Sequence, residues 1–134
     1  MIRVANFIGG RFVAPHSGRY FDDVNPATEE RIAEVPDSDG ADVDDAVAAA
    51  RAAFASWSKT PAAERSRILL KLADLIESDL ETLAVLESRD NGKAVSLARR
   101  LDIPRAVANF RFFASAILAT MTGQYPPAAT TPSA

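Results

Sequence analysis

Three side chains near the C-terminal end of the sequence have types and a spacing that could do chemistry. Arg105, Asn109 and Phe112 follow one another at i, i+4 and i+7, which places them on one side of a helix. The guanidinium could make a charge-assisted hydrogen bond to an acidic group. An arginine in a first helical turn, however, commonly pairs with a nearby acid such as Asp102, and the pattern alone favours that interpretation. The same interpretation applies to Arg99, Arg100 and Arg111.

The residue types that the chain lacks exclude several kinds of site. It has no cysteine, which removes disulfides, thiolate metal sites and every mechanism with a cysteine nucleophile. Its one histidine, His16, lies in the loop stretch APHSG; alone it cannot form a zinc site, and we expect it to be exposed to solvent. Gly9-Gly10 reads as a hairpin turn and the other glycines stand alone, so no glycine-rich strand-to-helix turn is available for a pyrophosphate.

Length, composition and charge restrict the class of protein. The 134 residues suffice for one compact domain or part of one, and 48% hydrophobic with 25% charged residues is typical of a folded soluble chain. A net charge of -3 argues against a nucleic-acid partner. The apolar stretches are too short to span a membrane, and MIRVANFIGG has neither a cleavable apolar core nor a small-residue cleavage site. We therefore expect a cytoplasmic protein.

The first residues have the pattern of β-hairpins. In NFIGGRFV two short apolar runs flank Gly9-Gly10, and glycine supplies the positive φ angles of a tight two-residue turn. GRYFDDVNP alternates into an extended segment that ends at Asn25-Pro26, and ERIAEVP, residues 30–36, is its expected return strand. These patterns predict a β-hairpin segment over residues 1–37.

From residue 38 onward the apolar residues recur at helical spacing. They predict a helix over residues 42–57 that Ser38 or Asp39 caps, and Thr60-Pro61 starts the next helix because proline presets φ in a first turn. Ser78 and Glu81 fit a capping box, so a third helix is predicted to begin there and to end at Gly92.

The last predicted helix carries the candidate site. A short helical turn over residues 94–100 leads to Asp102, the expected N-cap, and Gly123 is the expected end. The helical segment thus covers residues 38–122, and residues 123–134 are expected to form a disordered tail. The predicted fold class is an α+β fragment, with N-terminal β-hairpins followed by a helical cluster.

Six stretches in order resemble the N-terminal portion of the aldehyde dehydrogenase superfamily, over roughly residues 5–118. They are NFIGGRFV, FDDVNPATEERIAEVP, DVDDAVAAARAAFASW, TPAAERSRILLKLADLIE, LESRDNGK and RLDIPRAVANFRFFA. The last stretch is most similar to the branch that oxidises 2-aminomuconate and 2-hydroxymuconate semialdehydes with NAD. The expected fold therefore matches the start of the aldehyde dehydrogenase α/β fold.

The resemblance assigns a role to the three helical side chains. It implies that Arg105 lies on the substrate tunnel and grips the carboxylate of a semialdehyde, since a planar fork of donors suits a carboxylate better than a lysine point charge does. Asn109 and Phe112 would share that side of the helix.

The resemblance also implies a monovalent cation held near Asp23, Val24 and Asp90, largely by backbone carbonyls with an acidic side chain. The alternative is that Asp23 and Asp90 only serve a turn and a helix end. One departure is visible: where the family usually has glycine after NPAT, this chain has Glu29, so a turn that requires positive φ would be mildly strained or looser.

The chemistry of the family needs groups that this chain does not contain. Aldehyde oxidation there requires a cysteine thiolate, a glutamate base, an oxyanion-stabilising asparagine with backbone amides, and bound NAD. The resemblance covers about the first quarter of such an enzyme and fades near Leu118, the pattern of a truncated gene, a frameshift or a deliberate fragment. We therefore expect this chain to be inactive alone and to lack the main NAD-binding region.

The helices should also leave apolar surface uncovered. In whole enzymes of the family they pack against the nucleotide-binding sheet, so a face of Leu, Ile, Phe and Val is expected to be exposed here. Self-association or a protein partner through these faces is the expected consequence. Two other functions stay open, a non-catalytic interaction module derived from the family and a plain helical domain without a ligand.

Overall fold

The computed structural model describes residues 2–121, and their side chains as far as residue 119. Its elements in chain order are β1 (Ile2–Arg3), β2 (Asn6–Ile8), β3 (Arg11–Val13), β4 (Tyr20–Val24), β5 (Arg31–Pro36), α1 (Gly40–Trp57), α2 (Ala62–Ser78), α3 (Leu80–Asn91), α4 (Val95–Leu97), η1 (Ala98–Asp102) and α5 (Ile103–Met121). Strands followed by helices confirm the predicted fold class. The tail predicted over residues 123–134 and the helix end at Gly123 lie outside the described residues.

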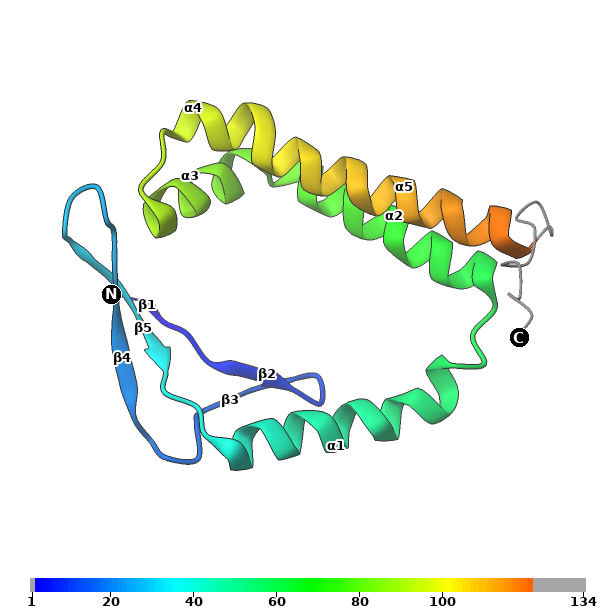
Figure 1. Ribbon diagram of the computed structural model, residues 1–134, viewed down its shortest axis with the longest axis horizontal. Helices are drawn as coiled ribbons and strands as arrows, with labels where there is room; N and C mark the ends of the chain where they lie inside the picture. Colours follow the sequence, from blue (N-terminus) through cyan, green and yellow to red (C-terminus); the bar gives the residue numbers. More distant parts are fainter. Residues whose placement is uncertain (1, 122–134) are drawn as a thin grey trace, which may run out of the picture.

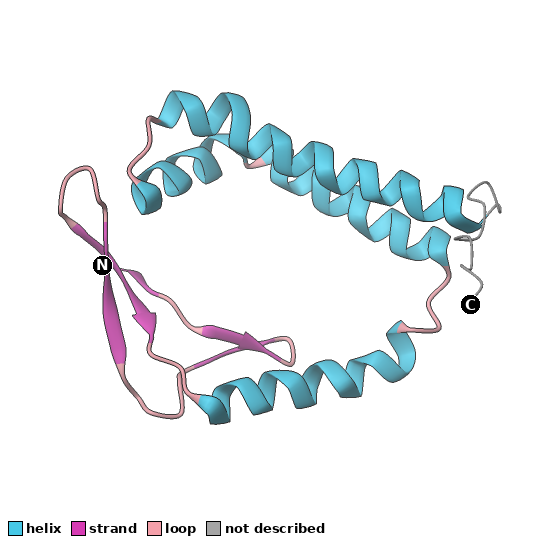
Figure 2. Ribbon diagram, viewed as in Figure 1, coloured by secondary structure: helices cyan, strands magenta, loops and turns pink. Residues whose placement is uncertain are grey.

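The elements form an open frame (Figure 1). The β1–β5–β4 sheet lies at one end, α1 runs along one side with the β2–β3 hairpin beside its first half, and the paired helices α2 and α5 run along the other side. Figure 2 shows that both small sheets lie apart from the α2–α5 pair. None of the helices between residues 2 and 121 combines the length and the apolar content that crossing a lipid bilayer requires.

Both predicted hairpins are present. Strands β2 and β3 pair antiparallel around Gly9 and Gly10, whose φ angles of 60° and 79° are the left-handed values that the sequence predicted. Strand β4 pairs antiparallel with β5, also as predicted. Strand β1 adds to β5 in parallel, with Ile2 opposite Ala33, a long-range pairing that the sequence did not indicate.

The turn between β4 and β5 contains the residue that departs from the family pattern. Glu29 has a φ of 60°, so it occupies the left-handed region that a glycine would occupy without strain. The turn is nonetheless closed, because the Glu29 N–H donates to the Asn25 carbonyl at 2.8 Å and the Ala27 N–H donates to Asn25 Oδ1 at 2.9 Å. The expected strain is therefore present, and the turn keeps its tight shape.

The start of α1 is fixed by two aspartates. Asp39 is the N-cap, one of the two predicted caps. Its N–H donates to Asp42 Oδ2 at 2.9 Å, which completes a capping box. The side chain of Asp42 also accepts the backbone N–H of His16 at 3.0 Å, and the residue is only 3% exposed. One buried carboxylate thus joins the start of α1 to the loop after β3.

The junction of α2 and α3 differs from the sequence prediction. Ser78 is the last residue of α2 and not an N-cap, since its hydroxyl donates to the Leu75 carbonyl at 2.8 Å. A hydroxyl that bonds back to its own helix is unavailable to the next helix. The single residue Asp79 makes the break, without a side-chain cap. The end of α3 was predicted correctly: Gly92 follows it with a φ of 76°.

The buried apolar residues of the described part are small. They are Ala33, Ala62, Ala73, Ala84, Ala98, Val107 and Ala114, and no large side chain there is fully buried. Large apolar side chains instead remain exposed on every long helix, for example Phe54 on α1, Leu75 on α2 and Phe113 on α5. The expected uncovered apolar faces are therefore present in this chain.

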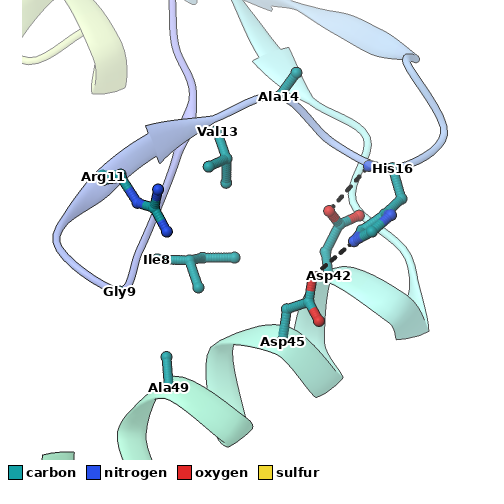
Figure 3. A pocket seen from close by; sticks show the side chains of 9 residues that line it. All are labelled: Ile8, Gly9, Arg11, Val13, Ala14, His16, Asp42, Asp45 and Ala49. Atoms are coloured by element: carbon teal, nitrogen blue, oxygen red, sulfur yellow. Dashed lines mark hydrogen bonds and ion pairs between the residues drawn. The ribbon is translucent and has the colours of Figure 1, made fainter.

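The contact between the β2–β3 hairpin region and α1 also contains an ion pair (Figure 3). His16 Nε2 lies 2.7 Å from Asp45 Oδ2, and the histidine side chain is 54% exposed, in agreement with the predicted exposure. The hydrogen bond and the negative charge of Asp45 raise the pKa of His16 above its ordinary value of 6.5. The protonated ring is therefore stabilised in the folded chain.

This ion pair predicts a pH-dependent contribution to stability. Because the folded-state pKa of His16 is raised, the stabilisation is complete below pH 6.5 and is lost as pH rises through the folded pKa. An NMR titration of the His16 ring should give a midpoint above 6.5, and Asp45→Asn should move it down. Asp44→Asn, on the same helix, is the control and should leave it unchanged. A normal midpoint in the parent chain would contradict the prediction.

Gly92 predicts a second effect on stability. A Cβ at Gly92 would lie 2.8 Å from Pro26 Cγ, whereas one at Gly10 would meet nothing within 4 Å, although both residues have positive φ. Gly10→Ala should therefore lower the free energy of unfolding by about 1 kcal/mol from backbone strain alone. Gly92→Ala should lower it by about 2–4 kcal/mol, because overpacking adds to that strain. Denaturant titration of the two variants checks this order, and equal losses would refute it.

Candidate functional site

The helix that carries Arg105 begins earlier than the sequence indicated. Asp102 was predicted as its N-cap, which is wrong, because α4, the π-helical turn η1 and α5 follow without a break from Val95. Pro104 explains the π turn: proline lacks an N–H and its ring clashes with the carbonyl four residues earlier. In η1 the Ile103 N–H reaches the Ala98 carbonyl, which widens the helix just before the proline.

The packing of α5 decides which of its sides is free. Val107 and Ala114, two turns apart, are buried on the side that meets α2. At about 100° per residue, Arg105, Asn109 and Phe112 lie roughly 140–180° away from these two positions. All three are exposed, so the structure brings the three predicted residues together on the outer side of α5.

Arg105 has no partner among the described residues. Neither Arg105 nor Asn109 makes a hydrogen bond or an ion pair to any residue between 2 and 119, so both side chains are available to a ligand. Phe112 is 65% exposed and makes an edge-to-face contact with Phe113, with 5.3 Å between ring centroids. The free side of α5 therefore presents a cation, an amide and an apolar ring.

Two of the three neighbouring arginines pair with acids as the alternative interpretation predicted, whereas Arg100 makes no hydrogen bond or ion pair to any residue between 2 and 119. Arg99 Nε donates to both carboxylate oxygens of Glu81 at 2.8 Å. Arg111 bridges Glu77 and Asp74, at 2.7 and 2.9 Å. These bonds, with Glu77 as the main cause, raise the pKa of Arg111, and the Arg111 bond lowers the pKa of Glu77. Arg105 differs from both because no acid closes on it.

Asp102, the expected partner of Arg105, is bound elsewhere. Lys93 Nζ lies 2.6 Å from Asp102 Oδ2 and 3.4 Å from Glu87 Oε1, and the side chains of Lys93 and Asp102 are mostly buried. The Asp102 hydrogen bond is the main cause of a raised pKa at Lys93. Sequence reasoning missed Lys93, since it lies in the loop between α3 and α4 and no periodicity joins a loop residue to Asp102.

The proposed cation residues lie only partly together. Asp23 and Asp90 line one cavity of about 430 Å³ between the β1–β5–β4 sheet and α3, together with Glu87, whereas Val24 is exposed and does not line it. Within the described residues no three His, Cys, Asp or Glu side chains are close enough to hold a metal ion. The structure therefore places Asp23 and Asp90, but not Val24, at one cavity.

A second cavity, of about 420 Å³, lies between the hairpin and α1 (Figure 3). Arg11, His16, Asp42 and Asp45 contribute its charged groups. Asp42 and Asp45 both bind His16, so these carboxylates connect the segment after β3 to α1. Asp42 was another residue that sequence reasoning missed, although its spacing from Asp39 is that of a capping box.

The start of α1 is already occupied by aspartate side chains. The strand-to-helix junction between β5 and α1 is the place where a pyrophosphate would bind to helix amides. There the Ala41 N–H already donates to Asp39 Oδ1 at 2.9 Å, and the carboxylate of Asp42 lies in the same first turn. Two negative side chains at this helix start oppose a further anion.

Comparison with known proteins shows which family this chain belongs to. The sequence pattern of the aldehyde dehydrogenase family matches residues 12–133. The match therefore extends beyond Leu118, where the sequence resemblance had seemed to end; the small and proline residues after 123 carry no periodicity to indicate it. A 2-aminomuconic semialdehyde dehydrogenase of Bos taurus is 52% identical over 118 residues, which are 88% of this chain and 24% of the relative.

Two further relatives show the range of the match. An acetaldehyde dehydrogenase of Pseudomonas aeruginosa is 50% identical over 117 residues, 87% of this chain and 23% of that protein. The NAD⁺ complex of an aldehyde dehydrogenase from Bacillus cereus superposes with a TM-score of 0.81 at 44% identity, covering 84% of this chain and 23% of that chain. The chain thus spans about a quarter of the length of these relatives. It belongs to the aldehyde dehydrogenase family and matches the start of that family's fold.

Proposed function

We propose that this chain is the N-terminal, substrate-gripping part of an NAD-dependent dehydrogenase that oxidises a carboxylated semialdehyde to the acid. The chain does not catalyse the reaction alone, because its 134 residues contain no cysteine to act as the nucleophile. Its relatives include both an enzyme named for 2-aminomuconic semialdehyde and one named for acetaldehyde, which has no carboxylate. The substrate is therefore decided by side chains and not by overall identity.

The observation that carries the proposal is the free guanidinium of Arg105. It is exposed at the start of a long helix, and no acid of the described chain neutralises it, whereas Arg99 and Arg111 are both paired. A substrate carboxylate can therefore bind it in the two-bond geometry that arginine favours, without first breaking an internal ion pair.

Asn109 and Phe112 would complete the contact with substrate. One turn after Arg105, the Asn109 amide can donate to the same carboxylate or to a polar substituent beside it. The exposed ring of Phe112 gives the carbon skeleton an apolar surface. NAD, when bound, accepts the hydride from the aldehyde carbon, and the groups that hold NAD and attack the aldehyde come from the rest of the enzyme.

A monovalent cation is the second part of the proposal. Asp23 and Asp90 line one cavity, and hard cations prefer oxygen ligands. In this proposal the ion joins the end of β4 to the end of α3, with Val24 contributing its backbone carbonyl. Its role is structural, since it lies on α3 and the sheet and not on the outer side of α5.

The substrate proposal is tested in a full-length chimera, in which the 118 aligned residues of this chain replace their counterparts in the bovine dehydrogenase. Arg105→Ala should lower the preference for 2-hydroxymuconate semialdehyde over hexanal, measured as the ratio of kcat/KM values, by about 10- to 100-fold. The reason is the loss of a charge-assisted bond that only the carboxylated substrate makes. Arg100→Ala removes the same charge from the preceding turn and should leave the ratio unchanged.

Arg105→Lys separates charge from geometry in the same assay. It keeps the cation but loses the two-bond fork, so part of the preference should remain. If Arg105→Ala leaves the ratio of kcat/KM values as it was, the carboxylate-gripping role is wrong.

A non-catalytic interaction module is the second candidate, favoured by the apolar side of α1. Val43, Val47 and Phe54 are exposed at helical spacing there. Sedimentation velocity should then show self-association that grows with concentration, because covering these side chains removes apolar surface from water. Phe54→Ser should weaken it and Arg51→Ser should not. A monomer at every concentration with slow amide exchange in all helices would exclude such a surface.

A further inference from the structure

We propose that Lys93 is a positioning residue for the substrate site: by holding Asp102, it keeps that carboxylate from closing on Arg105. The inference rests on the proposed function, since it concerns how Arg105 stays available to a substrate carboxylate. It assigns a role in specificity to a lysine in the loop between α3 and α4, outside the helix that carries the substrate residues.

Lys93 is held in place before its side chain reaches Asp102. Its backbone carbonyl accepts a hydrogen bond from Ser88 Oγ at 2.6 Å, and its N–H donates to Asn91 Oδ1 at 3.0 Å. Gly92, in the left-handed conformation, turns the chain so that the lysine follows the end of α3 directly. The lysine side chain therefore starts from a fixed backbone, so only its own rotamers are restricted when the ammonium group pairs with Asp102.

Without Lys93, Asp102 has two cations at helical reach. Arg105 is three residues after Asp102, and residues at this spacing are neighbours on a helix surface. Arg99 is three residues before it, but both oxygens of Glu81 already bind the Arg99 guanidinium at 2.8 Å. The positions four residues before and after Asp102 are Ala98 and Ala106, which carry no charge and cannot pair with it. Arg105, which has no partner within the described residues, is the cation that a released Asp102 would pair with.

The competition would act on substrate binding in two ways. An Asp102–Arg105 pair would occupy the donors that a substrate carboxylate needs. An unneutralised Asp102 would in addition repel that carboxylate, an effect that its 2.6 Å contact with the Lys93 ammonium now cancels. Neither effect applies to an aldehyde without a carboxylate, so Lys93 should influence discrimination between substrates and not the oxidation itself.

The test uses the full-length chimera described above. Lys93→Met should raise KM for 2-hydroxymuconate semialdehyde by about three- to tenfold with little change in kcat, since the lost contact binds ground state and transition state alike. KM for hexanal should stay the same. Lys93→Arg, which can still pair with Asp102, should resemble the parent, and Lys71→Met is the control for charge.

Rescue by a second substitution separates positioning from a merely structural role. Adding Asp102→Asn to Lys93→Met removes the competitor and should bring KM for the carboxylated aldehyde back toward the parent value. Loss of activity with both aldehydes and no rescue would mean that Lys93 only supports the fold, and an unchanged KM would mean that Asp102 does not compete. Either result overturns the inference.

A measurement on the 134-residue chain keeps this inference separate from the proposed function. In Lys93→Met, pairing with Asp102 should slow the exchange of the Arg105 Nε proton with water several-fold by NMR, and Asp102→Asn should reverse it. An unchanged Arg105 signal overturns the inference even if Arg105→Ala alters discrimination. If the signal changes but Arg105→Ala leaves discrimination intact, the proposed function has failed and the contact between these residues stands.

Discussion

The seam between α2 and α5 sets the orientation of everything that the candidate site uses. The buried residues of these helices are Ala62, Ser66 and Ala73 on α2 with Val107 and Ala114 on α5. All are small or medium-sized, so the two helix backbones approach closely. A seam this narrow leaves little rotational freedom, because turning α5 would drive a phenylalanine or an arginine into it. The outer side of α5 follows from this constraint, and with it the exposure of Arg105.

The small size of the buried residues is a property of the whole described chain and not only of the contact between α2 and α5. A structure whose buried apolar residues are almost all alanines gains little from removing side chains from water, while Phe54, Leu75 and Phe113 remain exposed. The described residues therefore leave most of their large apolar side chains in contact with water. This exposure is found in a chain that spans about a quarter of its relatives' length and contains no cysteine.

Local patterns predicted most of the fold, and the helix caps that they missed depend on side-chain bonds and helix continuity that such patterns do not show. Gly9-Gly10, the Asp39 cap and Gly92 were identified from a few neighbouring residues, because turn and cap geometry depends on them alone. The predicted caps at Ser78 and Asp102 were wrong for physical reasons. The Ser78 hydroxyl bonds within its own helix, and the helix runs unbroken through Asp102, whose carboxylate pairs with Lys93. Both bonds join residues that are close in sequence, three and nine positions apart, but cap motifs and apolar periodicity do not show them.

For the candidate site, sequence placed the three residues on one helix side, and the structure added their surroundings. That Arg105 lacks an acid, while Arg111 has two, depends on how α2 lies beside α5. The approach of Asp23 and Asp90 to one cavity likewise depends on packing of α3 near the sheet. Periodicity gives the direction of a side chain along its own helix but says nothing of what another element brings to it.

The π turn between Ala98 and Asp102 has a consequence for how such a site can diversify. A π turn is equivalent to one extra residue accommodated within a continuous helix. Deleting a single codon there would restore ordinary winding and rotate all that precedes it by roughly 100° relative to Arg105. A single deletion could thereby change the orientation of Arg105 relative to the residues before the π turn, while every amino acid on the substrate side of α5 stays the same.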